Sequence, residues 1–143
     1  MVPVSQLLAE KSPGVFSLRP EDPVIDAIRL MAEKSIGALL VMDGERLVGI
    51  LSERDYARKV ILLGRSSKDT PIASIMTPAP LITVSPKSTT RECVRLMTDR
   101  RIRHLPVLDG DRVIGMLSIG DLVRAIIQAQ DAEIAQLTQY ISG

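Results

Sequence analysis

The sequence predicts a mixed α/β (α+β) fold built from two tandem β-α-β-β-α units that end in a long C-terminal helix. Sliding the chain against itself by 66 residues aligns Val15–Arg58 with Leu81–Arg124 without a gap, and 15 of these pairs are identical. Each copy also places Asp-Gly between two aliphatic runs, which indicates a hairpin, and helical apolar patterns flank that hairpin. Because units of this size bury little surface alone, we expect the two sheets to pack face to face about a pseudo-twofold axis.

A short strand and a helix open each copy. Phe16–Leu18 and Leu81–Val84 are aliphatic or β-branched and are soon followed by a proline, as is typical of a short strand that ends in a turn. The helices that follow are expected to stop near Ser35 and Arg101. Their predicted caps are Asp22, with Pro23 as the first helical residue, and Ser88 or Thr89 paired with Glu92.

A hairpin and a second helix complete each copy. The predicted hairpin strands are Ala38–Met42 with Arg46–Leu51, and Leu105–Leu108 with Arg112–Leu117. The second helices are predicted over Asp55–Leu63 and from Asp121 onward. The first repeat then spans residues 1–66 (core 15–63) and the second spans residues 67–143 (core 81–127), with short helical lead-ins at Val4–Leu8 and Pro71–Met76.

The last helix carries an apolar stripe on roughly one face between Asp121 and Tyr140 and just beyond. Two explanations stay open: the stripe covers the protein's own core, or it meets a second subunit. The residues of the stripe are Val123, Ile127, Ile134, Leu137 and Ile141.

The composition excludes several classes of protein. With 18 Lys and Arg against 17 Asp and Glu, and few aromatic residues, the chain lacks a broad basic face for duplex DNA and platforms for stacked bases. Its longest apolar run is far too short to cross a bilayer, and no secretory signal is visible. One Cys and one His cannot form an internal disulfide or a four-ligand zinc site. We therefore expect a cytoplasmic protein that binds neither nucleic acid nor membrane.

The most informative motif is Gly-x-x-Ser-x-x-Asp. Its serine and aspartate are Ser52 and Asp55 in the first copy, and Ser118 and Asp121 in the second. Backbone N–H groups at a helix start attract phosphate, a serine can donate to it, and a carboxylate can accept from vicinal sugar hydroxyls. The motif therefore fits a ribonucleotide, but Ser-x-x-Asp is equally a helix capping pair. Its duplication favours the ligand, because twofold packing would place both carboxylates along one cleft.

The two motif copies differ in charge. Arg54 in the first copy is a planar donor suited to phosphate, whereas Gly120 at the same place allows close backbone approach but supplies no charge. Arg103 and His104 precede a buried strand beside the expected cleft, where they could reach a phosphate. The other explanation is that these cations face solvent at a helix end and that His104 is structural. We expect two non-equivalent sites.

No catalytic set is visible in the sequence. The single His has no nucleophile pattern near it, and no paired acids share an apolar pocket. Cys93 lies inside an amphipathic helix and is expected in the core. We therefore expect a protein that is not an enzyme, and turnover of a nucleotide by the purified chain would contradict this.

A duplicated β-α-β-β-α unit with two Gly-x-x-Ser-x-x-Asp endings and the stretch Ile102–Val107 resembles a tandem cystathionine-β-synthase (CBS) domain pair, or Bateman module. The stretches Ser52–Lys59, Gly64–Lys68 and Ile75–Thr77 are similar to stand-alone CBS-pair proteins of bacteria and plant organelles. The resemblance covers nearly the whole chain. It implies binding of an adenine nucleotide such as AMP, ATP or NAD, a homodimer, and a separate, unidentified target protein.

The resemblance also implies roles for individual residues. Serine and aspartate of the last motif would hold phosphate and ribose, and the hydroxyl residue of the first strand would line the adenine pocket. The basic pair before the second strand would reach the phosphate bound by the opposite copy; the first copy has Gly37 and Ala38 there, which leaves the Asp121 site without this help. The implied set is Ser17, Gly37, Ala38, Ser52, Arg54, Asp55, Thr83, Arg103, His104, Ser118, Gly120 and Asp121, with no metal.

Two functions from different classes follow. The first is a sensor: an adenine nucleotide between the copies shifts their relative angle or the dimer, and a partner protein reads the change. The alternative is a ligand-independent scaffold that dimerises through the long helix and uses Ser-x-x-Asp only as a cap. The alternative predicts no change in melting temperature with millimolar nucleotide.

Overall fold

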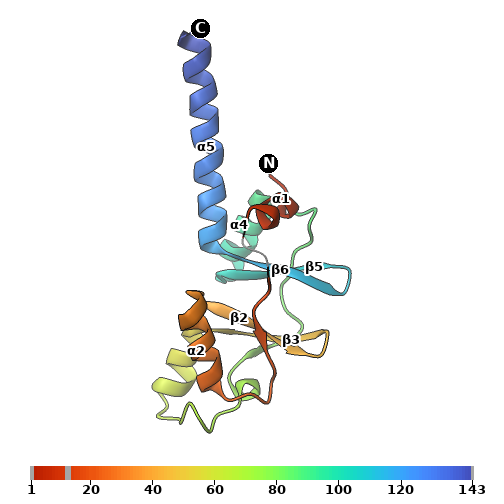
Figure 1. Ribbon diagram of the computed structural model, residues 1–143, viewed down its shortest axis with the longest axis vertical. Coiled ribbons are helices and arrows are strands. Elements are labelled where there is room, and N and C mark those ends of the chain that lie inside the picture. Colours follow the sequence, from red (N-terminus) through yellow and green to blue (C-terminus); the bar gives the residue numbers. More distant parts are fainter. Residues whose placement is uncertain (1, 12–13, 143) are drawn as a thin grey trace.

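The computed structural model describes residues 2–11 and 14–142, which form two α/β halves stacked on one another (Figure 1). A four-stranded sheet in the order β1-β2-β3-β4 and a two-stranded sheet, β5-β6, lie at the centre with helices outside them, which confirms the predicted fold class. The strands are β1 (Ser17–Leu18), β2 (Ala38–Asp43), β3 (Arg46–Ser52), β4 (Thr77–Pro78), β5 (His104–Asp109) and β6 (Arg112–Ser118). The helices are α1 (Val4–Glu10), α2 (Val24–Lys34), α3 (Glu53–Tyr56), α4 (Thr90–Arg100) and α5 (Ile119–Ser142), with a π-helical turn at Ala57–Ile61 and a 3-10 turn at Ile72–Ser74.

The two hairpins repeat one another in backbone geometry. β2 pairs antiparallel with β3, and β5 with β6, in the same register shifted by 66 residues. Both ladders are interrupted at the same place, directly after Val41 and Val107. The turns hold Gly44 and Gly110 at φ of 63° and 64°, a left-handed conformation that glycine adopts without steric cost. The Asp-Gly hairpins predicted from the sequence are confirmed.

The first strand predicted for the second copy, Leu81–Val84, is wrong, because within it only Val84 forms a β-bridge. In the first copy, the N–H of Leu40 donates to the carbonyl of Phe16 at 3.1 Å and helps to hold β1 against β2. The residue equivalent to Leu40 is Pro106, which has no N–H to donate. The second copy therefore keeps only a remnant of this strand.

The helix caps agree with one prediction and correct another. At α4, Thr89 and Glu92 form a capping box: Thr89 Oγ1 accepts from the Glu92 N–H at 3.3 Å, and the Glu92 carboxylate accepts from the Thr89 N–H at 3.4 Å. At α2 the predicted Asp22 cap is wrong, because Pro23 is the N-cap residue and Asp22 instead accepts from a backbone N–H three residues earlier, at 2.9 Å. Both helices end where predicted, at residues with positive φ, Ser35 (54°) and Arg101 (56°).

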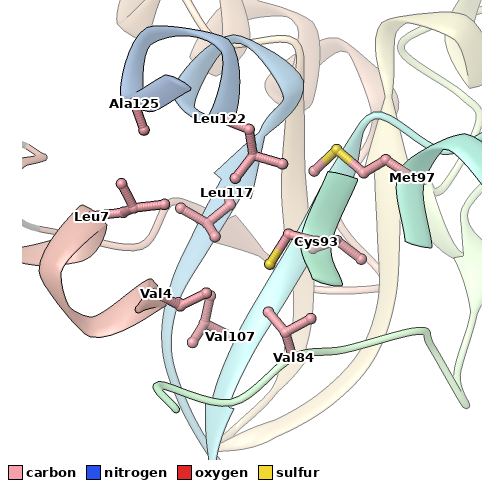
Figure 2. Packing of buried hydrophobic residues seen from close by; sticks show 10 residues of the cluster. Val4, Leu7, Val84, Cys93, Met97, Val107, Leu117, Leu122 and Ala125 are labelled. Atoms are coloured by element: carbon pink, nitrogen blue, oxygen red, sulfur yellow. The ribbon is translucent and has the colours of Figure 1, made fainter. Parts of the chain in front are cut away.

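Each half is completed by the segment that precedes the other half. Ile72 and Ile75, from the second repeat's lead-in, belong to the core of the first half, whereas Val4 and Leu7 of α1 belong to the core of the second. Figure 2 shows Val4 and Leu7 directed toward residues of β5, β6 and α5. The same core contains Cys93, as expected, and burial, aided by Glu92, raises the pKa of its thiol to about 11.

The second helices differ in length and exposure. In the first copy, helical structure starts at Glu53, two residues before the predicted start, and continues as the π-helical turn. In the second copy, α5 runs for 24 residues and projects away from both sheets (Figure 1). Its stripe does not cover the chain's own core, since Ile134 and Leu137 are 60% and 57% exposed. Among residues 2–11 and 14–142, none of the helices combines the length and apolar character that crossing a bilayer requires.

Candidate functional site

Ser52 and Asp55 join the end of β3 to the start of α3 through a capping box. The Asp55 N–H donates to Ser52 Oγ at 3.2 Å, while Asp55 Oδ2 accepts from the Ser52 N–H at 2.9 Å and from its hydroxyl at 3.1 Å. Asp55 Oδ1 accepts no hydrogen bond from the residues that the structure describes, and its ion-pair partner is Lys59 Nζ at 3.4 Å. The cap therefore uses one carboxylate oxygen and leaves the other available to a hydroxyl donor.

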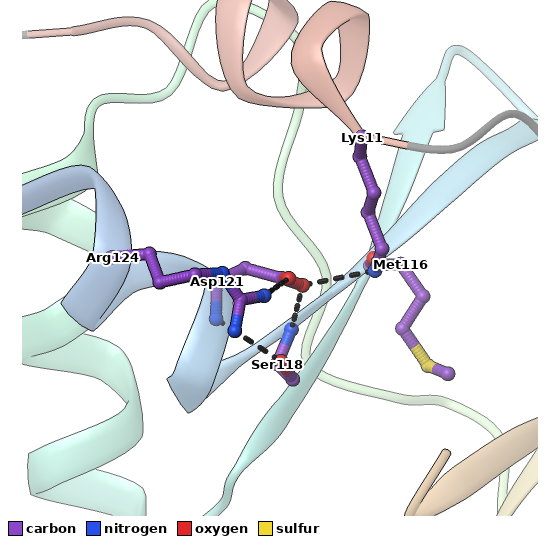
Figure 3. A network of polar contacts seen from close by, with 5 residues as sticks. All are labelled: Lys11, Met116, Ser118, Asp121 and Arg124. Atoms are coloured by element: carbon purple, nitrogen blue, oxygen red, sulfur yellow. Dashed lines mark hydrogen bonds and ion pairs between the residues drawn. The ribbon is translucent and has the colours of Figure 1, made fainter. Parts of the chain in front are cut away.

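Ser118 and Asp121 repeat the cap at the start of α5, but both oxygens of this carboxylate are engaged (Figure 3). Asp121 Oδ2 accepts from the Ser118 N–H at 2.8 Å and from Lys11 Nζ at 2.9 Å, and Oδ1 accepts from Arg124 Nη2 at 2.6 Å. Burial alone raises the pKa of Asp121, but the bonds from Ser118 and Lys11 outweigh it and hold that pKa below its usual value. The carboxylate is thus ionised and fully hydrogen-bonded at neutral pH.

A cavity of about 710 Å³ lies between the Ser52–Asp55 turn and the start of β5. This volume falls within the usual range for small-molecule sites. Six of the predicted site residues line it: Gly37, Ser52, Arg54, Asp55, Arg103 and His104. The first four come from the first copy and the last two from the second, so a molecule held here would touch both halves of the chain.

The cavity wall brings cationic and neutral donors opposite a carboxylate. Arg54 and Arg103 are exposed and take part in no ion pair within residues 2–11 and 14–142. His104 is half-buried, and burial lowers its pKa below the usual 6.5; Lys11 and Arg103 add to this effect, and Asp121 opposes it. At neutral pH the His104 imidazole is therefore uncharged and donates through one ring N–H.

Gly37 brings the first copy close to His104. A Cβ atom at position 37 would lie 3.2 Å from Glu53 Oε1 and 3.7 Å from His104 Nε2, so a side chain here would occupy space between the two halves. The short stretch before β2 therefore matters at this site because it is small. The same position in the second copy is Arg103, which supplies charge to the cavity instead.

The remaining predicted residues lie elsewhere. Ser17 lines a different cavity, of about 1010 Å³, at the tips of the two hairpins, together with Asp43, Arg46 and Arg112. Ala38 is buried within β2, and Thr83 is exposed and does not line either of the two cavities. Contrary to expectation, the two carboxylates do not share one cleft, because Ser118, Gly120 and Asp121 do not line the cavity at Asp55.

The segment that closes the cavity was not predicted from the sequence. Thr77, Pro80, Leu81 and Ile82 follow the lead-in of the second copy and line the cavity together with the apolar residues Ile102 and Pro106. Thr77 is brought there because β4 pairs with β3, which no local pattern signals. Lys11, which lies outside the aligned repeat, was not predicted either. No group of three or more metal-ligating side chains gathers within residues 2–11 and 14–142.

Comparison with known proteins gives a consistent set of relatives. The CBS domain family matches the chain twice, at residues 4–61 and 72–128. The mitochondrial CBS domain-containing protein CBSX3 of Arabidopsis thaliana is 46% identical over 127 residues, which cover 86% of this chain but only 62% of the plant protein. The structure of a putative signal-transduction protein with CBS domains from Burkholderia ambifaria matches with a TM-score of 0.86 and 52% identity, over 90% of this chain and 96% of that one. The CBS domain protein PAE2072 from Pyrobaculum aerophilum, complexed with AMP, matches with a TM-score of 0.77 and 27% identity, over 92% and 99% of the two chains.

Proposed function

This chain belongs to the CBS domain family as a regulatory CBS pair, and on that premise we propose that it binds an adenine nucleotide, AMP, ATP or NAD, in the cavity beside Asp55. The observation that carries the proposal is the position of Asp55 Oδ1. This oxygen accepts no hydrogen bond from the described residues and has only the ion pair with Lys59, and Asp55 lines a nucleotide-sized cavity that also bears Arg103 and His104.

Each part of a nucleotide has a chemically suitable partner on this wall. Asp55 accepts from the vicinal ribose hydroxyls, and Arg54, Arg103 and the neutral His104 donate to phosphate. Ser52 already donates its hydroxyl to Asp55, so its main contribution is to hold the carboxylate in place. The apolar side chains between Pro80 and Ile82 provide a surface for the adenine ring.

The test is calorimetric titration of the purified chain with AMP, ATP and NAD, repeated with Asp55→Ala. Loss of the ribose acceptor is expected to weaken binding about ten- to a hundredfold, which corresponds to about 1–3 kcal/mol. Asp99→Ala is the matched control, since Asp99 is exposed on α4 and forms no ion pair with another described residue. Unchanged affinity in Asp55→Ala would remove Asp55 from the site.

We propose that binding regulates a separate partner protein rather than starting a reaction on the nucleotide. A ligand held between residues of both halves changes their relative placement only through unequal affinity for the two arrangements. The location that we propose is the cytoplasm, as expected from the single cysteine. Hydrolysis of the nucleotide by the purified chain, followed by chromatography of the products, would contradict the non-catalytic role.

We also propose that the chain forms a homodimer through α5. The apolar stripe is exposed along a helix that projects beyond both sheets, and an isolated helical segment of this length is only marginally stable in water. Val123, Ile127, Ile134, Leu137 and Ile141 follow the three- and four-residue spacings, with one seven-residue step, that bring apolar residues onto one helix face.

The alternative function, a ligand-independent scaffold, is favoured by one observation: both Ser-x-x-Asp motifs form helix caps. Because Ser52 caps α3 under either function, loss of stability in Ser52→Ala does not distinguish them. A thermal shift does. A nucleotide that binds the native state raises the melting temperature in the millimolar range, and a scaffold shows no such rise.

A further inference from the structure

The carboxylates of the two motif copies have different surroundings: Asp121 binds a lysine from another segment, whereas Asp55 lines a cavity. Lys11, directly after α1, donates to the backbone carbonyl of Met116 at 2.7 Å and to Asp121 Oδ2 at 2.9 Å (Figure 3). The Asp121 side chain is 11% exposed, against 39% for Lys11, so the carboxylate is largely withdrawn from water and the ammonium group is not. Arg124 donates to the other carboxylate oxygen at 2.6 Å.

The lead-in segments explain why Lys11 reaches this place. The N–H of Val4 donates to the carbonyl of Ser88 as the N–H of Ile72 donates to that of Asp22, so the two lead-ins are related by a shift of 68 residues. This shift relates Lys11 to Ala79, whose side chain is a single methyl group. Lys11 donates to Met116 and to the carboxylate of Asp121, whereas the lead-in that packs into the first half supplies no lysine at the equivalent position.

The segment that precedes Lys11, residues 2–10, packs closely against the second half of the chain. A Cβ atom at Gly115 would lie 2.7 Å from Leu8 Cδ2, which shows how closely α1 approaches β6. The N–H of Val4 donates to the carbonyl of Ser88 at 2.8 Å, and the hydroxyl of Thr90 donates to the carbonyl of Val2 at 2.9 Å. A packed helix on one side and two hydrogen bonds on the other thus fix the origin of the Lys11 side chain.

We propose that Lys11 is an internal plug that takes the place of a ligand at Asp121, so that the chain binds nucleotide only at Asp55. The inference rests on the proposed function of the Asp55 cavity. A ribose hydroxyl at Asp121 would have to displace a charge-assisted bond of the partly buried carboxylate, and neutral donors are weaker partners for a carboxylate than an ammonium group. The ammonium group at Asp55 is held less closely: Lys59 Nζ lies 3.4 Å from Oδ1 and donates its hydrogen bond to the carbonyl of Ile75 at 3.0 Å instead.

The test is the stoichiometry of AMP binding, measured by calorimetry. The wild-type chain is expected to bind one AMP and Lys11→Met, which keeps the apolar part of the side chain, to bind two. The double variant Lys11→Met, Asp55→Ala is expected to bind one, at Asp121. The matched control is Lys87→Met, which removes an exposed lysine that forms no ion pair with another described residue and should leave one site.

The outcomes separate the inference from the proposed function. Two sites in the wild type, or one site in Lys11→Met, would overturn the plug and leave nucleotide binding intact. A single wild-type site whose affinity is unchanged in Asp55→Ala would overturn the Asp55 assignment. Binding in neither the wild type nor Lys11→Met would overturn both.

A second measurement needs no nucleotide. The carboxyl carbon of Asp121 is followed by NMR from neutral to acid pH in the wild type and in Lys11→Met. Removal of the ammonium group is expected to raise the pKa of Asp121, because Lys11 is one of the groups that lower it. Coincident titration curves would show that the plug does not form in solution and would overturn the inference.

Discussion

His104 is the only histidine of the chain, so its titration reports directly on the proposed phosphate position. In the ligand-free protein its pKa lies below 6.5, because burial disfavours the charged ring and Lys11 and Arg103 repel it, against the attraction of Asp121. We predict that AMP raises this pKa, because a phosphate in hydrogen-bond contact stabilises the imidazolium. The experiment therefore compares the pKa of His104 before and after the addition of AMP.

The expected size follows from the position of the ring. Charges about 4 Å apart interact by about 1 kcal/mol in water and about 4 kcal/mol at an effective dielectric constant of 20. His104 is only half-buried and Arg54 and Arg103 share the phosphate, so the lower part of this range applies. We expect a rise of about one pKa unit, which is about 1.4 kcal/mol or a tenfold tighter complex at low pH than at high pH.

The assay is a proton NMR titration of the His104 ring between about pH 5 and 8, with and without saturating AMP, together with AMP affinities at both ends of that range. Lys11→Met is an internal check, because removal of a repelling cation should raise the pKa of His104 without any ligand. An AMP complex in which the pKa of His104 does not move would refute the contact between its ring and the phosphate.

The lowered pKa of His104 also makes the stability of the folded chain depend on pH. The folded chain holds the proton on His104 less tightly than the unfolded chain, so the unfolded state binds more protons as pH falls. This stabilisation is complete above the unfolded value of about 6.5 and is lost as pH falls below it toward the folded value. Urea unfolding at pH 7.5 and 5.5 should show lower stability at pH 5.5 and a smaller difference in His104→Gln.

Three further predictions concern other parts of the chain. Thr89→Ala removes one side of the α4 capping box and is expected to cost about 0.5–2 kcal/mol, or about 2–6 °C in melting temperature by calorimetry, whereas an unchanged temperature would contradict the cap. Cys93, with a pKa raised to about 11 and a buried side chain, should react with a thiol reagent at pH 8 only when the protein unfolds; rapid labelling of the native chain would argue against its burial. Leu137→Asp on the exposed stripe of α5 should convert the proposed dimer to a monomer in sedimentation or light scattering, and a monomeric wild type would remove that role from α5.

The sequence predicted the features that depend on short-range chemistry. Asp-Gly turns define the hairpins, so their strands were predicted to within one or two residues of β2, β3, β5 and β6. Thr89 and Glu92 are three residues apart, and their capping box needs no other part of the fold. The Ser52–Asp55 turn, Arg103 and His104 do line one cavity, and their roles toward a nucleotide stay predictions.

The errors have long-range causes. The missing strand at Leu81–Val84 depends on Pro106 in a neighbouring strand, whose effect appears only when the two copies are compared position by position. Lys11 was missed because it lies before the aligned repeat, which starts at Val15, and because its partner Asp121 is far away in the sequence. Apolar cavity residues such as Leu81 and Ile82 resemble core residues in sequence, and only the exchange of lead-in segments brings them to the surface of a cavity.

The asymmetry of the two motif copies has a consequence for regulation. The cavity at Asp55 takes Arg103 and His104 from the second half, so a nucleotide there bridges the two halves. The Lys11–Asp121 pair does not bridge them, because α1 packs into the same core as β6 and α5. A ligand can bias an arrangement only where its affinity differs between the alternatives, and the Asp55 cavity contacts both halves. With Asp121 plugged, one molecule bound at Asp55 would set the relative placement of the two halves.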